Sequence, residues 1–140
     1  MPNRILIIED EAEDMLMLKT KFSLSDFEVI EARDAKNGLL AARDGKPDII
    51  LLDLVLGSDK PFMESTSLKD SHNLEFSGIR LLRKLKSDPE TAHIPIAVIS
   101  NLGRDAYEAQ TKKLGALDYL VKSELLPEEI VERAGKLIHK

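Results

Sequence analysis

The sequence predicts an α/β fold in which helices cover both faces of a parallel sheet of five strands. Five short runs are nearly all apolar, and longer amphipathic stretches separate them: the runs are residues 5–8, 27–32, 49–52, 96–99 and 117–121. A strand that is apolar at every position is typically buried on both faces, as in parallel sheets. The amphipathic stretches supply helices to cover those faces.

The intervening stretches have the apolar spacing of helices. Apolar stripes are expected on the first, third and last helix: Ala12, Met15, Leu16 and Phe22; Ile79, Leu82 and Leu85; Ile130, Val131, Ala134, Leu137 and Ile138. Pro127 suits the first position of the last helix. Gly45 and Gly115 are typical of residues that end a helix.

Composition narrows the chemistry that the chain can perform. The 140 residues include no cysteine, which excludes disulfides, thiolate zinc sites, iron–sulfur clusters and a cysteine nucleophile. A hydrophobic share of 43% with a net charge of −5 indicates a folded chain with no broad attraction for nucleic acid. We expect one domain over residues 1–140.

No apolar run is long enough to cross a membrane, and residues 1–4 lead into the first strand without a signal-peptide pattern. We therefore expect a cytoplasmic protein with no membrane partner and no direct nucleic-acid partner.

Residues 57–77 break the alternation of strands and helices. Their sequence, GSDKPFMESTSLKDSHNLEFS, is polar and irregular, and predicts a loop inserted between the third strand and the third helix. Loops of this length inside a compact domain are usually functional or disordered.

Chemistry-bearing side chains cluster where the predicted strands end. Glu9 and Asp10 follow the first strand, Asp53 the third, Ser100 the fourth and Lys122 the fifth. Ligands of open parallel sheets bind outside the carboxyl ends of the strands. We expect these side chains to share one edge of the sheet.

Converging carboxylates repel one another, and a cation relieves that repulsion. Magnesium suits such a site because it binds one or two carboxylates together with phosphate oxygens. Lys122 and Ser100 can each pair with an oxygen of a phosphoryl group. Asp53 is then the candidate nucleophile that accepts this group.

Each residue also has a structural interpretation. Asp10 and Glu13 can cap the first helix. Ser100 and Asn101 are common in turns. Lys122 can be a solvated lysine, and Tyr119 can be a packed strand residue. Only their common location at one sheet edge favours function.

Four segments together resemble the receiver domain of two-component response regulators: ILIIEDE, PDIILLDLVL, IPIAVISN and LGALDYLVKS. The resemblance covers nearly the whole chain apart from residues 57–77. It implies a flavodoxin-like, doubly wound sheet with strand order 2-1-3-4-5. It also implies a signalling module, and not an enzyme.

The resemblance implies a role for each site residue. Asp53 accepts a phosphoryl group from a sensor histidine kinase or phosphotransfer protein, and Lys122 pairs with the modified carboxylate. Mg²⁺ is held by Glu9, Asp10, Asp53 and the main-chain carbonyl of Val55. Ser100 and Tyr119 act as switch residues.

The same resemblance implies that a downstream protein binds the face formed by the fourth helix, the fifth strand and the fifth helix. The fourth helix presents Ala106, Ala109, Gln110 and Lys113 as first candidates. The sequence does not identify that partner.

The chain departs from the family pattern at several positions. Glu9 replaces an aspartate, Gly57 a proline and Asn101 a small residue. Ser123 stands where a proline, often after a cis bond, is typical. The sequence therefore does not determine the geometry of the peptide bond between Lys122 and Ser123.

The inserted loop is the largest departure, since it adds roughly seventeen residues between Asp53 and Gly78. Its apolar residues can fold over the site or form a docking surface: they are Phe62, Met63, Leu68, Leu74 and Phe76. A tolerated surface insertion is an equal alternative. His72, His93 and His139 lack the spacing of a metal site.

Other functions fit the residues less well. A haloacid dehalogenase-type phosphohydrolase needs a second aspartate at the position of Val55, and a flavodoxin needs a less acidic loop after the first strand. Nucleotide-binding glycine motifs are absent from the sequence. The remaining alternative is a receiver-like adaptor (a pseudo-receiver) that never accepts phosphate, with the inserted loop covering the site.

Overall fold

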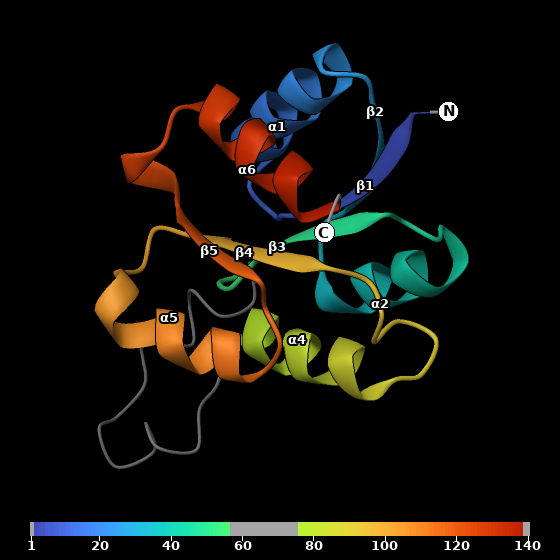
Figure 1. The fold of residues 1–140 in the computed structure, drawn as a ribbon, viewed down its shortest axis with the longest axis vertical. Helices are drawn as coiled ribbons and strands as arrows, with labels where there is room; N and C mark the ends of the chain where they lie inside the picture. Colours follow the sequence, from blue (N-terminus) through green and yellow to red (C-terminus); the bar gives the residue numbers. More distant parts are fainter. Residues whose placement is uncertain (1, 57–75, 139–140) are drawn as a thin grey trace.

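The computed structural model describes residues 2–56 and 76–138, and contains a parallel sheet between two layers of helices (Figure 1). The strands are β1 (Asn3–Ile8), β2 (Phe27–Ala32), β3 (Ile49–Asp53), β4 (Ile96–Ser100) and β5 (Asp118–Val121). Their order in the sheet is β2-β1-β3-β4-β5, and each neighbouring pair is parallel. The predicted fold class and strand order are confirmed.

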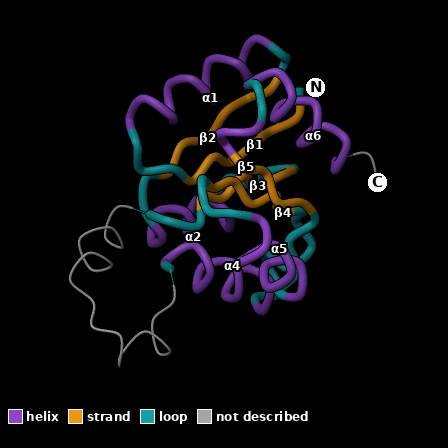
Figure 2. Tube along the Cα trace, turned by 90° about the vertical axis from the view of Figure 1, so that its left-hand side faces the viewer, coloured by secondary structure: helices purple, strands orange, loops and turns teal. Residues whose placement is uncertain are grey.

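The helices are α1 (Ala12–Leu24), α2 (Ala35–Asp44), α4 (Ser77–Ser87), α5 (Arg104–Lys113) and α6 (Pro127–Ile138), with a short 3₁₀ helix η2 (Lys122–Glu124). Helices α1 and α6 cover one face of the sheet, while α2, α4 and α5 cover the other (Figures 1 and 2). This arrangement follows from the right-handed crossovers that parallel strands require.

Alternation along the central strands divides the core into two halves. In β1, Ile5 and Ile7 pack in the core under α1 and α6, whereas Leu6 and Ile8 pack in the core under α2 and α4. All four side chains are completely buried. The edge strand β2 is less buried, which explains why it tolerates the exposed residues Glu28 and Glu31.

The predicted apolar stripe of α1 is wrong in part. Met15, Leu18 and Phe22 form its buried face, but Leu16 is 65% exposed and Ala12 is also exposed. Leu16 lies one position, and therefore about 100°, away from Met15 around the helix, which turns it toward solvent.

The ends of the elements follow the predicted glycines closely. Gly45 is the C-cap of α2, and Gly115 follows the C-cap of α5 with a φ of 113°, a left-handed value that favours glycine. Strand β5 begins at Asp118, one residue after the predicted start, and Leu117 is half exposed.

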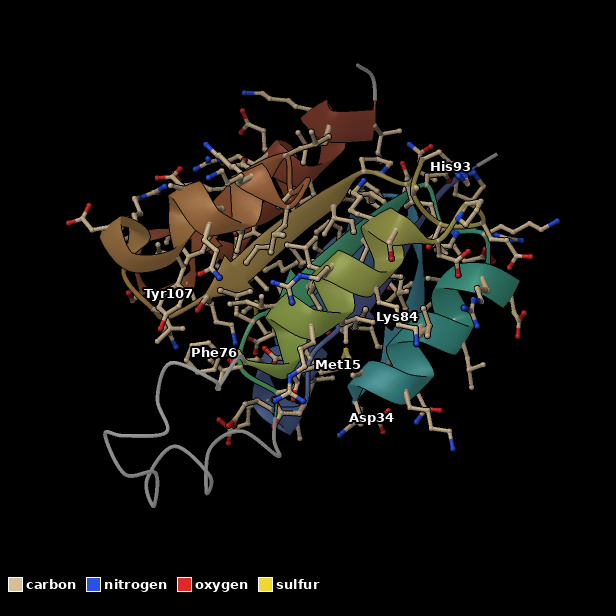
Figure 3. All side chains as sticks on the ribbon, turned by 90° about the horizontal axis from the view of Figure 1, so that it is seen from below. Met15, Asp34, Phe76, Lys84, His93 and Tyr107 are labelled. Atoms are coloured by element: carbon tan, nitrogen blue, oxygen red, sulfur yellow. The ribbon has the colours of Figure 1, made fainter. Side chains whose placement is uncertain are left out.

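Helix α4 begins one residue earlier than the predicted loop over residues 57–77 implies. Ser77 begins α4, and Phe76 is buried at the start of that helix. Its ring meets the ring of Tyr107 on α5 edge to face, with 5.4 Å between centroids (Figure 3). Phe76 is therefore a core residue here, while the other apolar residues of the loop, Phe62, Met63, Leu68 and Leu74, lie outside the described residues.

No helix in the described ranges is both long and apolar enough to cross a membrane.

Candidate functional site

Three carboxylates meet at the carboxyl edge of the sheet. Asp53 ends β3, and Glu9 and Asp10 directly follow β1, the neighbouring strand. Glu9 and Asp53 are 0% and 4% exposed. Each of the three residues offers one carboxylate oxygen, and these oxygens all lie within 4.8 Å of one another. The predicted convergence of these side chains is present in the structure.

The ammonium group of Lys122 lies among carboxylates. Its Nζ atom donates to Oε1 of Glu9 at 2.5 Å and to Oδ2 of Asp53 at 3.2 Å. A third hydrogen bond, of 2.9 Å, goes to Oδ2 of Asp14 on α1. The interpretation of Lys122 as a solvated lysine is therefore wrong, because its side chain is only 13% exposed.

Local structure explains why Lys122 points at the site. It directly follows β5 and begins η2, so its backbone leaves the sheet at the same edge as Glu9 and Asp53. Ser123 is exposed, and no peptide bond among the described residues is cis. Serine in place of the usual proline is thus accommodated by a trans bond in a 3₁₀ turn.

Burial and charge change the acidity of the two central groups. Burial, together with a hydrogen bond to the Glu9 side chain, raises the pKa of Asp53 to about 8, although the charge of Lys122 opposes the shift. Burial by itself would lower the pKa of Lys122. The negative charges of Asp53 and Glu9 outweigh that effect and raise its pKa above the usual range. Lys122 is therefore a permanent cation here, and Asp53 can hold a proton near neutral pH.

The backbone around Asp53 is tightly held. Oδ1 of Asp53 accepts a hydrogen bond of 3.0 Å from the amide of Val55, and the amide of Gly78 donates to the carbonyl of Leu54. A Cβ atom on Gly78 would lie 2.4 Å from the Asp53 carbonyl oxygen and 2.5 Å from Leu54 Cα. Glycine at this position allows α4 to pack directly behind the Asp53 backbone.

Ser100 and Tyr119 converge on Leu102. Ser100 Oγ accepts a hydrogen bond of 2.9 Å from the Leu102 amide, and the Tyr119 hydroxyl donates to the Leu102 carbonyl at 2.9 Å. Ser100 is 1% exposed and Tyr119 is completely buried. Burial raises the pKa of the Tyr119 hydroxyl. Leu102, a loop residue, therefore connects Ser100 at the end of β4 with the side chain of Tyr119 on β5.

Several predicted residues have simpler surroundings. The N-cap residue of α1 is Glu11 and not Asp10, and the side chain of Glu11 forms no capping hydrogen bond. Asn101 is exposed beside the site, and Val55 is half buried, with the role of its carbonyl still a prediction. His93 is exposed, while His72 and His139 lie outside the described residues.

Asp14 was not predicted as a site residue. It lies in the first turn of α1, four positions after Asp10, which precedes the helix. A further acidic residue a few positions after the end of the first strand was the signal available in the sequence. Its contact with Lys122 depends on the approach of β5 to α1, which the sequence pattern does not specify.

The predicted partner-binding face is accessible on α5. Ala109, Gln110 and Lys113 are exposed, whereas the side chain of Ala106 lies outside the described part of the chain. Arg104, at the start of α5, donates to the carbonyl of Tyr119 on β5 at 3.3 Å. The helix is thus connected to the strand that carries the candidate switch residue.

The acidic cluster has the chemistry of a site for a small, hard cation. Glu9, Asp10 and Asp53 supply only oxygen ligands, which magnesium prefers to nitrogen or sulfur. A raised pKa at Asp53 is the expected effect of crowding carboxylates in a buried place, and a divalent cation would reverse it. The residues present therefore fit Mg²⁺.

Curated bacterial proteins are similar to this chain in sequence. The chain is 31% identical over 136 residues to the phosphate regulon transcriptional regulatory protein PhoB of Pseudomonas aeruginosa. The match covers 97% of this chain and 52% of that protein. The chain thus spans about half the length of that relative. It is also 28% identical over 119 residues to protein PilH of the same species, covering 85% of this chain and 84% of PilH.

Solved structures have the same fold. A response regulator structure from Chloroflexus aurantiacus matches with a TM-score of 0.81 and 22% identity, covering 100% of both chains. The receiver domain of the sensor histidine kinase PA1611 from Pseudomonas aeruginosa, with magnesium in its active-site cleft, matches with a TM-score of 0.77 and 17% identity, again covering 100% of both chains.

A sequence model described as the response regulator receiver domain matches residues 5–134, which is most of the chain. Receiver domains are signalling modules and not enzymes. The chain belongs to the response regulator receiver domain family.

Proposed function

We propose that this chain acts as a response regulator receiver domain that accepts a phosphoryl group on Asp53, in the presence of Mg²⁺, from a sensor histidine kinase or a phosphotransfer protein. The observation that carries the proposal is the convergence of Glu9, Asp53 and Lys122, in which one ammonium contacts both buried carboxylates. Such a cation is needed to neutralise an oxygen of the incoming phosphoryl group.

The proposed transfer starts from a phosphohistidine. A carboxylate oxygen of Asp53 attacks phosphorus, the O–P bond forms, and the P–N bond breaks with its electron pair returning to the imidazole ring. Asp53 must be deprotonated to attack, so its raised pKa makes loss of the proton part of the activation. Lys122 and the Ser100 hydroxyl donate to phosphoryl oxygens.

Magnesium held by Glu9, Asp10, Asp53 and the Val55 carbonyl would supply the remaining positive charge at the phosphoryl oxygens. The magnesium ion in the PA1611 receiver domain supports the same choice of metal here. The ligand role of the Val55 carbonyl is part of this proposal.

The proposed switch starts at Ser100. Its Oγ atom holds the Leu102 amide, so a turn toward a phosphoryl oxygen gives up that hydrogen bond. The carbonyl of Leu102 also accepts a hydrogen bond from the Tyr119 hydroxyl, and the Arg104 guanidinium donates a hydrogen bond to the carbonyl of Tyr119. A change at Ser100 therefore reaches α5, and the downstream protein reads the face of α5, β5 and α6.

One alternative function draws on a specific observation. Asp53 is only 4% exposed, as expected for an adaptor whose site does not admit a donor. Such an adaptor would bind partners through the same face without modification.

Phosphotransfer profiling separates the two functions. Purified histidine kinases, labelled on histidine, are mixed with the wild-type chain and with Asp53→Asn, each with Mg²⁺ or with a chelator. The proposal predicts that the phosphoryl label is transferred only to the wild-type chain, and only when Mg²⁺ is present. Absence of label from every kinase and phosphotransfer protein tested favours the adaptor.

A further inference from the structure

Lys122 has three ammonium protons, and the structure gives each of them a carboxylate. Two of the acceptors, Glu9 and Asp53, belong to the acidic cluster. The third, Asp14, lies outside that cluster, on the first turn of α1. Asp14 is also the most accessible of the three, with a side chain that is 36% exposed. It therefore lies on the solvent side of Lys122, where an incoming group arrives.

We propose that Asp14 is a positioning residue that restrains phosphorylation by competing with the phosphoryl group for Lys122. This inference rests on the proposed function of Asp53. The Asp14 carboxylate occupies a proton of Lys122 that a phosphoryl oxygen would otherwise take. Removal of that carboxylate frees the proton for the incoming group.

The charge of Asp14 acts in the same direction. Asp14 and Asp53 contact the same Nζ atom, so the two contacting oxygens lie within about 6 Å of each other. A negative charge at this distance opposes an anionic donor. Partial solvent exposure moderates the effect, and we expect a gain of roughly threefold to tenfold in rate when the charge is removed.

The test is the second-order rate constant for phosphorylation by acetyl phosphate, followed by intact mass at saturating Mg²⁺. Asp14→Asn is compared with wild type and with Glu13→Gln, a matched control. Glu13 is exposed, lies one position away in the same helical turn, and loses the same charge. We expect Asp14→Asn to react faster and Glu13→Gln to keep the wild-type rate. Asp14→Glu, which retains a carboxylate, should return toward that rate.

A second comparison tests whether Asp14 acts through Lys122. In a Lys122→Ala background, Asp14→Asn should lose most of its effect, because the shared ammonium is absent. An equal gain in both backgrounds would contradict competition for Lys122, and so would equal gains from Asp14→Asn and Glu13→Gln. Thermal unfolding of each variant is measured alongside, since a merely structural role changes stability without this coupling.

The outcomes separate this inference from the proposed function. If wild type is phosphorylated and Asp14→Asn reacts at the same rate, only the role of Asp14 is overturned. If the wild type is not phosphorylated while Asp14→Asn is, the proposed restraint of phosphorylation by Asp14 is supported. If neither is modified by acetyl phosphate or phosphoramidate, both the acceptor role of Asp53 and the restraint by Asp14 are overturned.

Discussion

The Nζ atom of Lys122 lies 3.2 Å from Oδ2 of Asp53, although 69 positions separate the two residues in the chain. Asp53 ends β3 and Lys122 directly follows β5, and these two strands are not neighbours, because β4 lies between them. The lysine side chain must therefore extend across the end of β4, where Ser100 is located. This arrangement places the cation, the candidate acceptor and the candidate switch hydroxyl at one edge of the sheet.

Stability should fall as the pH rises from 6 to 8 when Mg²⁺ is absent. Asp53 has a pKa of about 8 in the folded state, against an ordinary value of 3.8. In this range the folded chain holds a proton that the unfolded chain has lost, so raising the pH favours unfolding. The slope can reach about 1.4 kcal/mol per pH unit for one group. Urea unfolding at several pH values measures it.

Asp53→Asn is the control for that slope. The variant lacks the titrating group and should be more stable than wild type at pH 8, with a smaller difference at pH 6. Parallel pH profiles for the two proteins would assign the dependence to other groups. The raised pKa of Lys122 adds no slope here, because that residue remains charged throughout the range.

Magnesium should raise the melting temperature by binding the folded state. Asp10→Asn removes a carboxylate of the acidic cluster and should reduce this rise at a fixed Mg²⁺ concentration. Asp105→Asn, an exposed change on α5 with the same loss of charge, serves as the comparison and should keep the full rise. Equal rises in all three proteins would remove Asp10 from the metal site.

Gly78→Ala should destabilise the chain by about 1–3 kcal/mol, the usual cost of overpacking. Its Cβ atom would meet the backbone of Asp53 and Leu54, which cannot move aside as a flexible side chain can. Gly135→Ala on α6 is the matched change, because its Cβ atom meets nothing within 4 Å. Alanine there should stabilise the helix slightly. Similar denaturation midpoints for both variants would contradict the close approach at Gly78.

Tyr119→Phe should lower the free energy of unfolding by about 1 kcal/mol, since the partly buried Leu102 carbonyl loses its hydroxyl donor. The phosphorylation rate by acetyl phosphate should remain close to that of wild type, because this hydroxyl points at Leu102 and not at the acidic cluster. Denaturation midpoints and intact-mass time courses measure the two effects. A large loss of rate would place Tyr119 in the acceptor chemistry.

The sequence predicted the sheet well because burial on both faces leaves a simple pattern. The run at residues 49–52 is apolar throughout, and β3 is fully buried. Partial burial is harder to predict: Leu16 is apolar but exposed, because an apolar side chain alone does not fix which face of α1 packs on the sheet.

The members of the site were also predictable, since they fall at strand ends that a parallel sheet brings together. Glu9, Asp53 and Lys122 are examples. Their partners were not. Asp14 contacts Lys122, and Phe76 packs on Tyr107, only through the packing of helices against each other and against loops. Such contacts depend on distances between elements that periodicity does not encode.

The central claim is that Asp53 is the phosphoryl acceptor, and intact mass after incubation with acetyl phosphate tests it most directly. With Mg²⁺, the wild-type chain should gain the mass of one phosphoryl group, and a chelator should prevent the gain. Asp53→Asn should gain nothing under the same conditions. An unmodified wild-type chain, or an equal gain in Asp53→Asn, would contradict the account.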